Sequence, residues 1–241
     1  MRLDRFLSNS LRMTRSVACA IIKEKRVKVN GVIIRKKEFK IDEIKDVIEF
    51  DDKRVEYRCF VYYMLNKPKG VVSARIDNID KTVVDLIDTD YKISPIGRLD
   101  KDTTGLLLLS NDGSLIHALT SPLNDIKKIY LVECDRDLSE EEMFLFENGI
   151  EIKDGDDQLF RTKKANIKKI KDYIYEVEIS EGKFHQVKRM FNYFNSSVIN
   201  LRRLKFANIK LDASLNEGEY RELTDAEVLL LKRQCNLLDK K

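Results

Sequence analysis

A polar loop followed by an unbroken run of four leucines is the most distinctive hydrophobic pattern in the chain. The stretch Gly97–Gly113 reads GRLDKDTTGLLLLSNDG, and the turn sequence Asn111-Asp112-Gly113 ends the run. A short apolar run between turn residues is typical of a strand that is buried on both faces. Polar side chains at the end of such a strand are held rigidly, so we expect this loop to carry chemistry if any segment does.

Apolar patterns elsewhere predict a mixture of strands and helices after residue 60. We predict strands over 61–65, 105–109, 129–134, 172–180 and 199–205, and helices over 82–87, 114–119, 139–147, 184–194 and 224–235. In the fourth strand, Tyr173, Tyr175, Val177 and Ile179 alternate with Ile174, Glu176 and Glu178, which is typical of an antiparallel strand with one wetter face. Because strands and helices do not alternate regularly, the pattern favours an α+β domain with a mixed, mainly antiparallel sheet over a doubly wound parallel sheet.

The first 60 residues have a different pattern, of two short helices followed by a hairpin. The first helix has an apolar stripe of Leu3, Phe6 and Leu7. Thr14 is a suitable N-cap for the second, whose apolar face carries Val17, Ala18, Ile21 and Ile22. Residues 26–34 then read as two strands around an Asn30-Gly31 turn. We therefore predict a small N-terminal domain over residues 1–59 and a second domain over residues 60–241.

The net charge of +4 is distributed unevenly along the chain. Residues 1–60 contain 16 Lys and Arg against 10 Asp and Glu, a net charge of +6, whereas residues 61–241 contain 29 against 31, a net charge of −2. Such asymmetry indicates either a solvated basic face or a module that binds a polyanion. Residues 1–40 carry 12 cations and three anions, which favours a phosphate-binding face. The candidate RNA-binding residues are Arg2, Arg5, Arg12, Arg15, Lys23, Lys25, Arg26 and Lys28.

This N-terminal unit resembles the S4 RNA-binding domain. The family's pattern is R-L-D-x-F-L, then T-R-S-x-A, then V-x-V-N-G, and it is met in order by Arg2–Leu7, Thr14–Ala18 and Val27–Gly31. The resemblance implies that the pair of helices contacts structured RNA. Because S4 domains occur in unrelated enzymes and ribosomal proteins, the resemblance indicates a class of ligand and not a reaction.

Composition argues against several other classes of protein. No apolar segment is long enough to cross a membrane, and no apolar signal core follows the N-terminal MRLDR. The four cysteines are isolated and the chain has two histidines, so we do not expect a zinc cluster. We expect a reduced, cytoplasmic protein without a metal.

The segment Leu65–Gly70, which reads LNKPKG, follows an apolar strand. It is either a Pro/Gly turn with solvent-facing lysines or a device that places two cations, Lys67 and Lys69, near the edge of the sheet. Taken alone, this segment does not decide between these interpretations.

The segment Glu181–Phe191, which reads EGKFHQVKRMF, places a lysine among aromatic residues. Continued as a helix, it aligns Phe184, Val187, Phe191 and Phe194 on one stripe, with Lys188 inside it. An inward lysine either extends past the rings to water or pairs with an anion, for which Asp100 is the leading candidate. Nothing in the pattern requires His185 to act as an acid or a base.

Asp100 and Asp102 have three possible roles. As a metal-binding pair they lack a third carboxylate at a suitable spacing. They could instead form a turn or a cap, together with Thr103 and Thr104. The third possibility is that one carboxylate is a nucleophile that attacks an electrophilic sugar or ring carbon.

Together these segments resemble the pseudouridine synthase family, in the branch that carries an S4 domain ahead of the catalytic domain. The hallmark G-R-L-D-x-x-T-x-G is present as Gly97–Gly105. It is joined in order by L-N-K-P-x-G at 65–70, K-x-Y at 128–130 and E-G-x-x-x-Q-V-K-R-M at 181–190. Phe184-His185-Gln186 in the last block resembles the RsuA family, which acts on small-subunit rRNA, whereas relatives acting on large-subunit RNA tend to have N-R-Q.

The resemblance implies an isomerase that converts a uridine of ribosomal RNA to pseudouridine. The likeness to the RsuA family implies that this uridine is at position 516 of 16S rRNA. It makes Asp100 the nucleophile, Lys188 its basic partner and Tyr130 the ring that stacks on the flipped uridine. We assign substrate binding to Arg98, Lys67, Lys183, His185, Gln186 and Arg189. The implied enzyme is a monomer without a cofactor, acting on rRNA or a small-subunit ribonucleoprotein intermediate. The alternatives are a 23S rRNA enzyme of the same family and a non-catalytic RNA-binding ribosome assembly factor.

Overall fold

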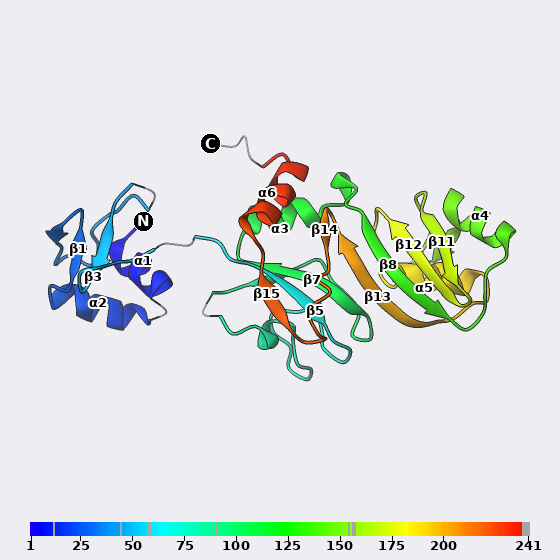
Figure 1. Ribbon diagram of the computed structural model, residues 1–241, viewed down its shortest axis with the longest axis horizontal. Coiled ribbons are helices and arrows are strands. Elements are labelled where there is room, and N and C mark those ends of the chain that lie inside the picture. The colour runs from blue at the N-terminus through cyan, green and yellow to red at the C-terminus, as the bar shows by residue number, and fades with distance from the viewer. Residues whose placement is uncertain are drawn as a thin grey trace. The chain divides into compact units, whose positions relative to one another are not determined.

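A computed structural model of the chain describes residues 1–11, 13–43, 45–56, 59–89, 91–153, 155 and 158–237. The chain divides into two compact units (Figure 1), which are described separately below. One contains residues 1–61 and 89–92, and the other contains residues 62–88 and 93–241. The boundary near residue 59 remains a prediction from the sequence.

The N-terminal unit contains the two predicted helices and the predicted hairpin. Its elements are α1 (Leu3–Ser10), α2 (Arg15–Lys23), β1 (Val27–Val29), β2 (Val32–Ile33), β3 (Ile48–Phe50) and β4 (Lys53–Arg54), with the strands in the order β2-β1-β3-β4. The Thr14 side chain caps α2 by accepting a hydrogen bond from the Val17 amide at 3.3 Å. Val17 itself is 47% exposed, so the apolar face of α2 consists of Ala18, Ile21 and Ile22 and is narrower than predicted.

A nine-stranded sheet organises the second unit. Its strands are β5 (Tyr62–Lys67), β6 (Ser94–Ile96), β7 (Thr104–Ser110), β8 (Lys128–Cys134), β11 (Asn166–Lys171), β12 (Ile174–Ile179), β13 (Val198–Phe206), β14 (Ile209–Lys210) and β15 (Tyr220–Glu222). The main path runs β11-β12-β8-β13-β7-β5-β15, with β14 beside β13 and β6 beside β7. Of these described pairings, β13 with β7 is parallel and the rest are antiparallel. The predicted α+β class with a mixed, mainly antiparallel sheet is confirmed.

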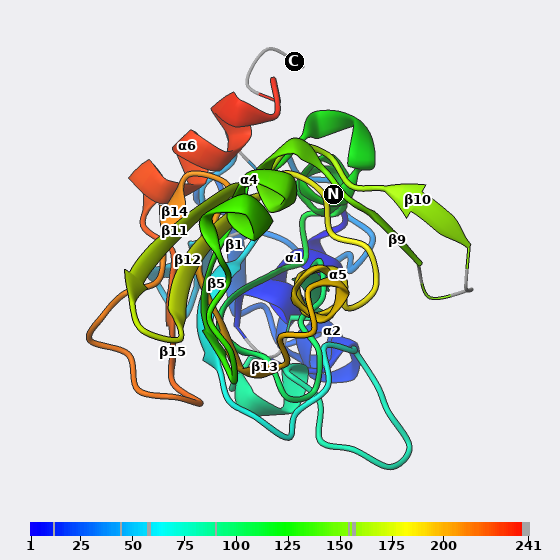
Figure 2. The ribbon, with the colours of Figure 1, turned by 90° about the vertical axis from the view of Figure 1, so that its right-hand side faces the viewer.

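Helices flank the two ends of this sheet. They are α3 (Gly113–Thr120), α4 (Glu140–Asn148), α5 (Gln186–Tyr193) and α6 (Asp225–Gln234), with 3₁₀ turns at Val84–Leu86 and Pro122–Asn124 and a small separate hairpin of β9 (Glu151–Lys153) and β10 (Leu159–Arg161). Figure 1 shows α3 and α6 near β15 and β7, and α4 and α5 near β11 and β12. Figure 2 shows α5 alongside β13, which it contacts.

Strand β7 is the buried centre that the leucine run predicts. All seven of its residues are buried, and Leu106 to Leu109 have no exposed surface. Leu106 and Leu108 pack into one core cluster with Leu115 and Leu119 of α3 and Leu231 of α6. Asp112 caps α3 by accepting a hydrogen bond from the Leu115 amide, which ends the strand and begins the helix within three residues.

Two predicted elements begin later than the sequence pattern indicates. Tyr173 has a φ of 64° and lies in a turn, half exposed, so β12 begins at Ile174. His185 has a φ of 52°, and this left-handed residue delays the start of α5 to Gln186. Phe184 therefore leaves the predicted stripe and is 58% exposed, whereas Val187, Phe191 and Phe194 are buried as expected.

Candidate active site

The loop before β7 is fixed to the sheet by its backbone. The Leu99 amide donates to the Ser73 hydroxyl oxygen at 3.0 Å, and that hydroxyl donates to the Leu99 carbonyl at 2.8 Å. Gly105, at the end of the loop, has a φ of 98°, and a Cβ at this position would lie 2.3 Å from the Arg203 carbonyl oxygen. Glycine is therefore required for β7 to approach β13 this closely, and this approach holds Asp100 at the edge of the sheet.

Lys67, predicted to bind substrate, lies beneath the loop and does not line the cavity described below. Its side chain is fully buried, and its Nζ donates to the carbonyl oxygens of Pro68 at 3.0 Å, Asp100 at 3.0 Å and Thr103 at 2.9 Å. Burial lowers the pKa of Lys67 to about 8, although the charges of Asp100 and Asp102 oppose this shift. Because strand β5 ends under the loop, the Lys67 ammonium group contacts the backbone of the loop and holds it in place.

The predicted contact between Lys188 and Asp100 is present. From α5, the Lys188 Nζ lies 3.2 Å from Asp100 Oδ2 and 2.6 Å from Asp102 Oδ1. The lysine side chain is 17% exposed, so it contacts both carboxylates instead of extending into water. Burial raises the pKa of Asp102, but the hydrogen bond from Lys188, the charge of that lysine and smaller contributions together outweigh burial, so the net pKa of Asp102 is lowered. His185 Nε2 lies 3.6 Å from the other oxygen of Asp100.

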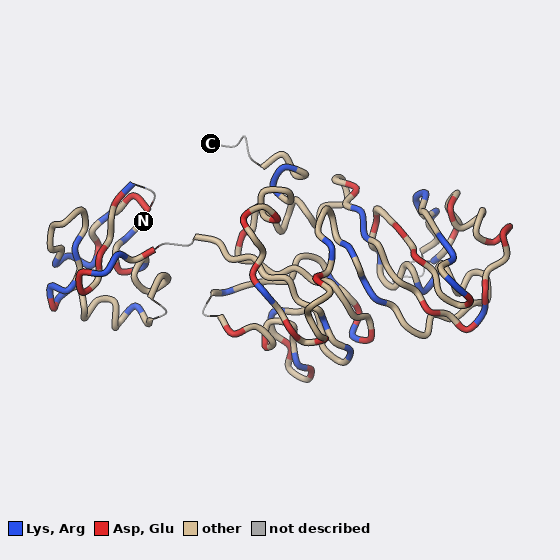
Figure 3. The backbone as a smooth tube through the Cα atoms, viewed as in Figure 1, with Lys and Arg blue, Asp and Glu red and all other residues tan. Residues whose placement is uncertain are grey.

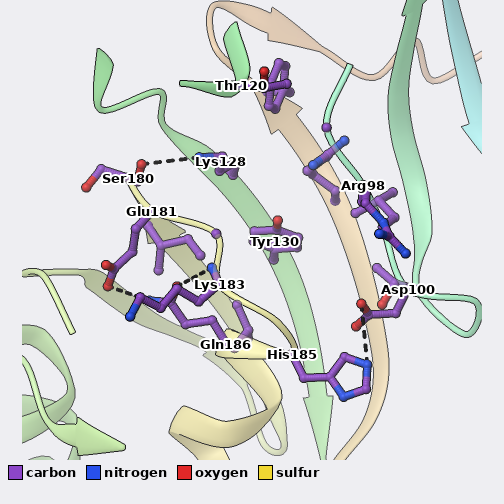
Figure 4. Close-up of a pocket in the computed structure, with 18 of the residues that line it drawn as sticks. Arg98, Asp100, Thr120, Lys128, Tyr130, Ser180, Glu181, Lys183, His185 and Gln186 are labelled. Atoms are coloured by element: carbon purple, nitrogen blue, oxygen red, sulfur yellow. Dashed lines mark hydrogen bonds and ion pairs between the residues drawn. The ribbon is translucent and has the colours of Figure 1, made fainter. Parts of the chain in front are cut away.

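Asp100 borders a cavity of about 450 Å³ (Figure 4). Figure 4 shows His185 pointing toward Asp100, and Tyr130 on strand β8. Tyr130 is 7% exposed, whereas Arg98 is exposed at the cavity's rim. The predicted site residues that line this cavity are Arg98, Asp100, Tyr130, Lys183, His185 and Gln186.

The turn before α5 is held by its own side chains. Gln186 is buried, its Nε2 donates to Glu181 Oε1 at 2.6 Å, and its Oε1 accepts from the Lys183 amide at 3.0 Å. The Lys183 Nζ lies over the Phe160 ring, 3.6 Å from its centroid. These contacts fix the left-handed turn that directs His185 to Asp100.

Arg189, also predicted to bind substrate, does not line this cavity. Its guanidinium donates to the Lys153 carbonyl at 2.7 Å and lies 5.4 Å from the centroid of the Phe184 ring. In a helix, Arg189 is one position beyond Lys188 and points about 100° away from it. The contact with Lys153 therefore supports the β9–β10 hairpin.

Two cations among the cavity residues that were not assigned from the sequence are Lys128 and Arg203. Lys128, at the start of β8, donates to the Ser180 carbonyl at 3.2 Å, and burial, followed by the charge of Arg203, lowers the pKa of Lys128 to about 8. Arg203 on β13 is 2% exposed, and its Nε donates to the Leu106 carbonyl at 2.8 Å. Consecutive arginines in a strand point to opposite faces, so the pair Arg202-Arg203 already indicates one inward arginine.

The basic residues of the N-terminal unit fall into two groups (Figure 3). Those with carboxylate partners are Arg2 and Arg15, which share Asp4, Arg26, which pairs with Asp51, and Lys28, which pairs with Asp52. Arg5, Lys23 and Lys25 are exposed and form no ion pair with another described residue. Arg12 lies outside the described residues.

The described part of the chain has neither a cluster of metal-binding side chains nor a membrane-spanning helix. The described residues contain no group of three or more His, Cys, Asp or Glu side chains that could hold a metal ion. All four cysteines are free. No helix among the described residues is long and apolar enough to span a membrane.

Comparisons with known proteins agree with this arrangement. Residues 61–193 match the RNA pseudouridylate synthase family model, and residues 1–48 match the S4 domain model. An uncharacterized RNA pseudouridine synthase of Bacillus subtilis is 39% identical, covering 96% of this chain and 98% of the relative. Ribosomal small subunit pseudouridine synthase A of Haemophilus influenzae is 38% identical, with coverage of 95% and 98%.

Similarity to a solved structure also indicates the pseudouridine synthase family. A crystal structure of a pseudouridylate synthase matches with a TM-score of 0.67 and 37% identity, covering 96% of this chain and 99% of that one. Asp100 and Tyr130 line one cavity, and Lys188 contacts Asp100. The chain therefore belongs to the RNA pseudouridylate synthase family, with an S4 domain ahead of its catalytic domain, and is an RNA pseudouridine synthase.

Proposed function

We propose that this enzyme isomerises one uridine of small-subunit ribosomal RNA, at position 516 of 16S rRNA, with Asp100 as the nucleophile. The observation that carries the proposal is one carboxylate, Asp100, beside a cavity that Tyr130 also lines, with a cation 3.2 Å from that carboxylate. The 16S target is supported by the Phe184-His185-Gln186 sequence and by relatives named ribosomal small subunit pseudouridine synthase A.

The reaction breaks the N1–C1′ bond, turns the uracil and joins C5 to C1′. A carboxylate oxygen of Asp100 attacks the nucleotide, at C1′ of the sugar or at C6 of the ring, and is released when the new C–C bond forms. The detached uracil leaves as an anion, so one carboxylate suffices where most glycosidases use two. The C5 proton passes to solvent. The exchange is redox-neutral and consumes no co-reactant.

Lys188 and Asp102 serve the nucleophile in different ways. The Lys188 cation lies 3.2 Å from Asp100 Oδ2 and holds this carboxylate in place beside the cavity. Asp102 is 69% exposed and accepts from Lys188 at 2.6 Å, so it orients the lysine and shapes the loop.

The target base must leave its stack to reach Asp100. Tyr130 on β8 lines the cavity with a largely buried ring, against which the flipped uracil stacks. Arg98 at the rim contacts the displaced nucleotide or fills the space that it leaves. These assignments rest on position in the cavity and on the family motif.

The N-terminal unit supplies electrostatic affinity for RNA. Each phosphate contact contributes about 0.7 to 0.9 to the slope of log affinity against log salt concentration. Replacing Arg5, Lys23 and Lys25 together by alanine should therefore reduce that slope by about 2. Arg26→Ala, which removes a cation already paired with Asp51, should change it less. An unchanged slope in the triple variant would refute RNA binding by these cations.

Mapping pseudouridines in 16S and 23S rRNA from cells with and without the gene tests the target. We expect loss of one pseudouridine, at position 516 of 16S rRNA, restored by the wild-type gene and not by Asp100→Asn. Loss at a 23S position would support the large-subunit alternative, and no loss would support an assembly factor. Purified protein with naked 16S rRNA or a small-subunit intermediate then identifies the substrate form. We expect a cytoplasmic monomer, and sedimentation tests the oligomeric state.

A further inference from the structure

Arg203 is a buried cation in the wall of the cavity to which the proposed mechanism gives no role. Arg203 is 2% exposed and lines the cavity, and its Nε donates to the Leu106 carbonyl. Its Nη2 is buried without a hydrogen-bond partner, and it forms no ion pair with a carboxylate among the described residues. Burying an unpaired charge is costly, so this position calls for a function that repays the loss of stability.

The sheet places this guanidinium between the two catalytic elements. Strand β13 lies between β7 and β8, and Arg203 is opposite Gly105 on β7 and Tyr130 on β8. Its Cζ lies 4.8 Å from the centroid of the Phe206 ring, which supports one side of the guanidinium. Asp100 precedes β7 by a few residues, so the cation is built into the same rigid frame as the nucleophile.

Other charged groups around the cavity increase the positive potential at this wall. Lys128 interacts electrostatically with Arg203 and is itself a cation below about pH 8. The acidic residues of the lining are Asp100, paired with Lys188, and Glu181, whose Oε1 accepts from Gln186 and from the Lys163 amide. Neither of these two carboxylates forms an ion pair with Arg203.

We propose that Arg203 is a further catalytic residue, which stabilises the negative charge that develops on the uracil ring. The proposal rests on the function proposed above. When Asp100 attacks C1′, the electron pair of the N1–C1′ bond stays with the uracil and spreads over N1 and the two carbonyl oxygens. When Asp100 attacks C6 instead, the pair of the C5–C6 double bond moves onto the C4 carbonyl oxygen. Both routes place an anion on the ring, so the assignment does not depend on the point of attack.

The chemistry of the group suits this task. A preorganised donor aimed at developing charge in a dry site contributes more than the same donor in water, because no reorganisation is needed at the moment of reaction. The Nη2 of Arg203 is an unused donor on a permanently charged group, held by Leu106 and Phe206. Arginine also keeps its charge when buried more readily than lysine, whose pKa burial lowers.

The proposal is tested by comparing reaction rates on two RNAs that carry either uridine or 5-fluorouridine at the target position. The RNA is one that the wild-type enzyme modifies. Fluorine stabilises the uracil anion, so a fluorinated base needs less help from a cation. In single turnover, Arg203→Met should slow consumption of uridine by about 10²- to 10³-fold, the usual effect of losing one such donor. The loss with 5-fluorouridine should be at least tenfold smaller, by the same reasoning. Arg203→Lys, which keeps a cation, should lie between wild type and Arg203→Met.

Arg202→Met is the matched control, because Arg202 is the neighbouring residue on the same strand. Its side chain is 37% exposed, and its Nη1 lies 3.6 Å from Glu217 Oε1. This variant should leave both rates within about threefold of wild type, because surface ion pairs contribute little. Equal losses with both bases in Arg203→Met would mean that Arg203 only supports the sheet, and unchanged rates would also overturn the proposal. If Arg203→Met does not fold, the ratio of the two losses in Arg203→Lys decides between these outcomes. Wild-type inactivity on every rRNA would instead contradict the proposed function.

Discussion

Replacing Lys188 with methionine removes the cation that contacts both carboxylates of the loop. Its Nζ lies 3.2 Å from Asp100, and at an effective dielectric constant of about 20 two unit charges at that separation attract by about 5 kcal/mol. Partial exposure of the two side chains, 17% and 26%, reduces the net effect through screening. A hydrogen bond to a charged group contributes about 1.5 to 3 kcal/mol, so we expect a rate loss of about 10- to 150-fold.

Tritium release from RNA labelled at C5 of uridine measures this loss, because the C5 proton is lost to solvent in each turnover. Under single-turnover conditions the rate constant should fall while the dissociation constant for RNA changes by less than about threefold. Lys188→Arg keeps the charge and should recover most of the rate. Asp102→Asn leaves the Lys188–Asp100 contact in place and should lower the rate by less than about threefold, because the partner it removes is exposed.

Two outcomes would refute this reasoning. An equal loss of binding and turnover in Lys188→Met would mean that the lysine contacts RNA instead of supporting Asp100. A larger loss in Asp102→Asn than in Lys188→Met would mean that the two aspartates have been assigned the wrong roles.

Three further predictions follow from the geometry. Gly105→Ala should destabilise the fold by about 2 to 4 kcal/mol in denaturant unfolding, because the new Cβ would lie 2.3 Å from the Arg203 carbonyl oxygen at a positive φ. An unchanged denaturation midpoint would contradict the observed approach of β7 to β13. Burial raises the pKa of Asp4, but the hydrogen bond from Arg2 contributes to a net lowering below 3.8. Asp4 therefore stabilises the N-terminal unit above about pH 4, and this stability is lost as the pH falls. In Asp4→Asn, the unfolding midpoint should lose this acid dependence. Burial lowers the pKa of Lys128 to about 8, so its positive charge is present below that pH and lost above it. The turnover rate should therefore decline from pH 7 to pH 9 less steeply in Lys128→Met than in wild type.

The sequence was sufficient where chemistry and hydrophobic pattern coincide. Four consecutive leucines between turn residues predict β7, and an inward lysine in an otherwise apolar stripe predicts the contact of Lys188 with Asp100, because burial of an unpaired charge is costly. Each pattern lies within one short segment of the sequence, and both the strand and the contact are observed.

The unpredicted features depend on contacts between distant segments. Lys67 reads as a turn lysine, and its burial follows from the loop that folds over β5. Helical periodicity cannot reveal the left-handed His185, which removes Phe184 from the predicted stripe. Strand alternation indicates that one of Arg202 and Arg203 is inward, but only the order β8-β13-β7 shows which one meets the cavity.

The central claim is that the carboxylate of Asp100 makes the covalent bond to the nucleotide, and the Asp100→Asn enzyme tests it most directly. Asparagine has nearly the same size and cannot act as a carboxylate nucleophile, so RNA affinity should stay within about threefold of wild type. Single-turnover formation of pseudouridine, measured by nucleoside analysis of the RNA, should fall by at least about 10³-fold. Pseudouridine formation at the wild-type rate by this variant would contradict the account.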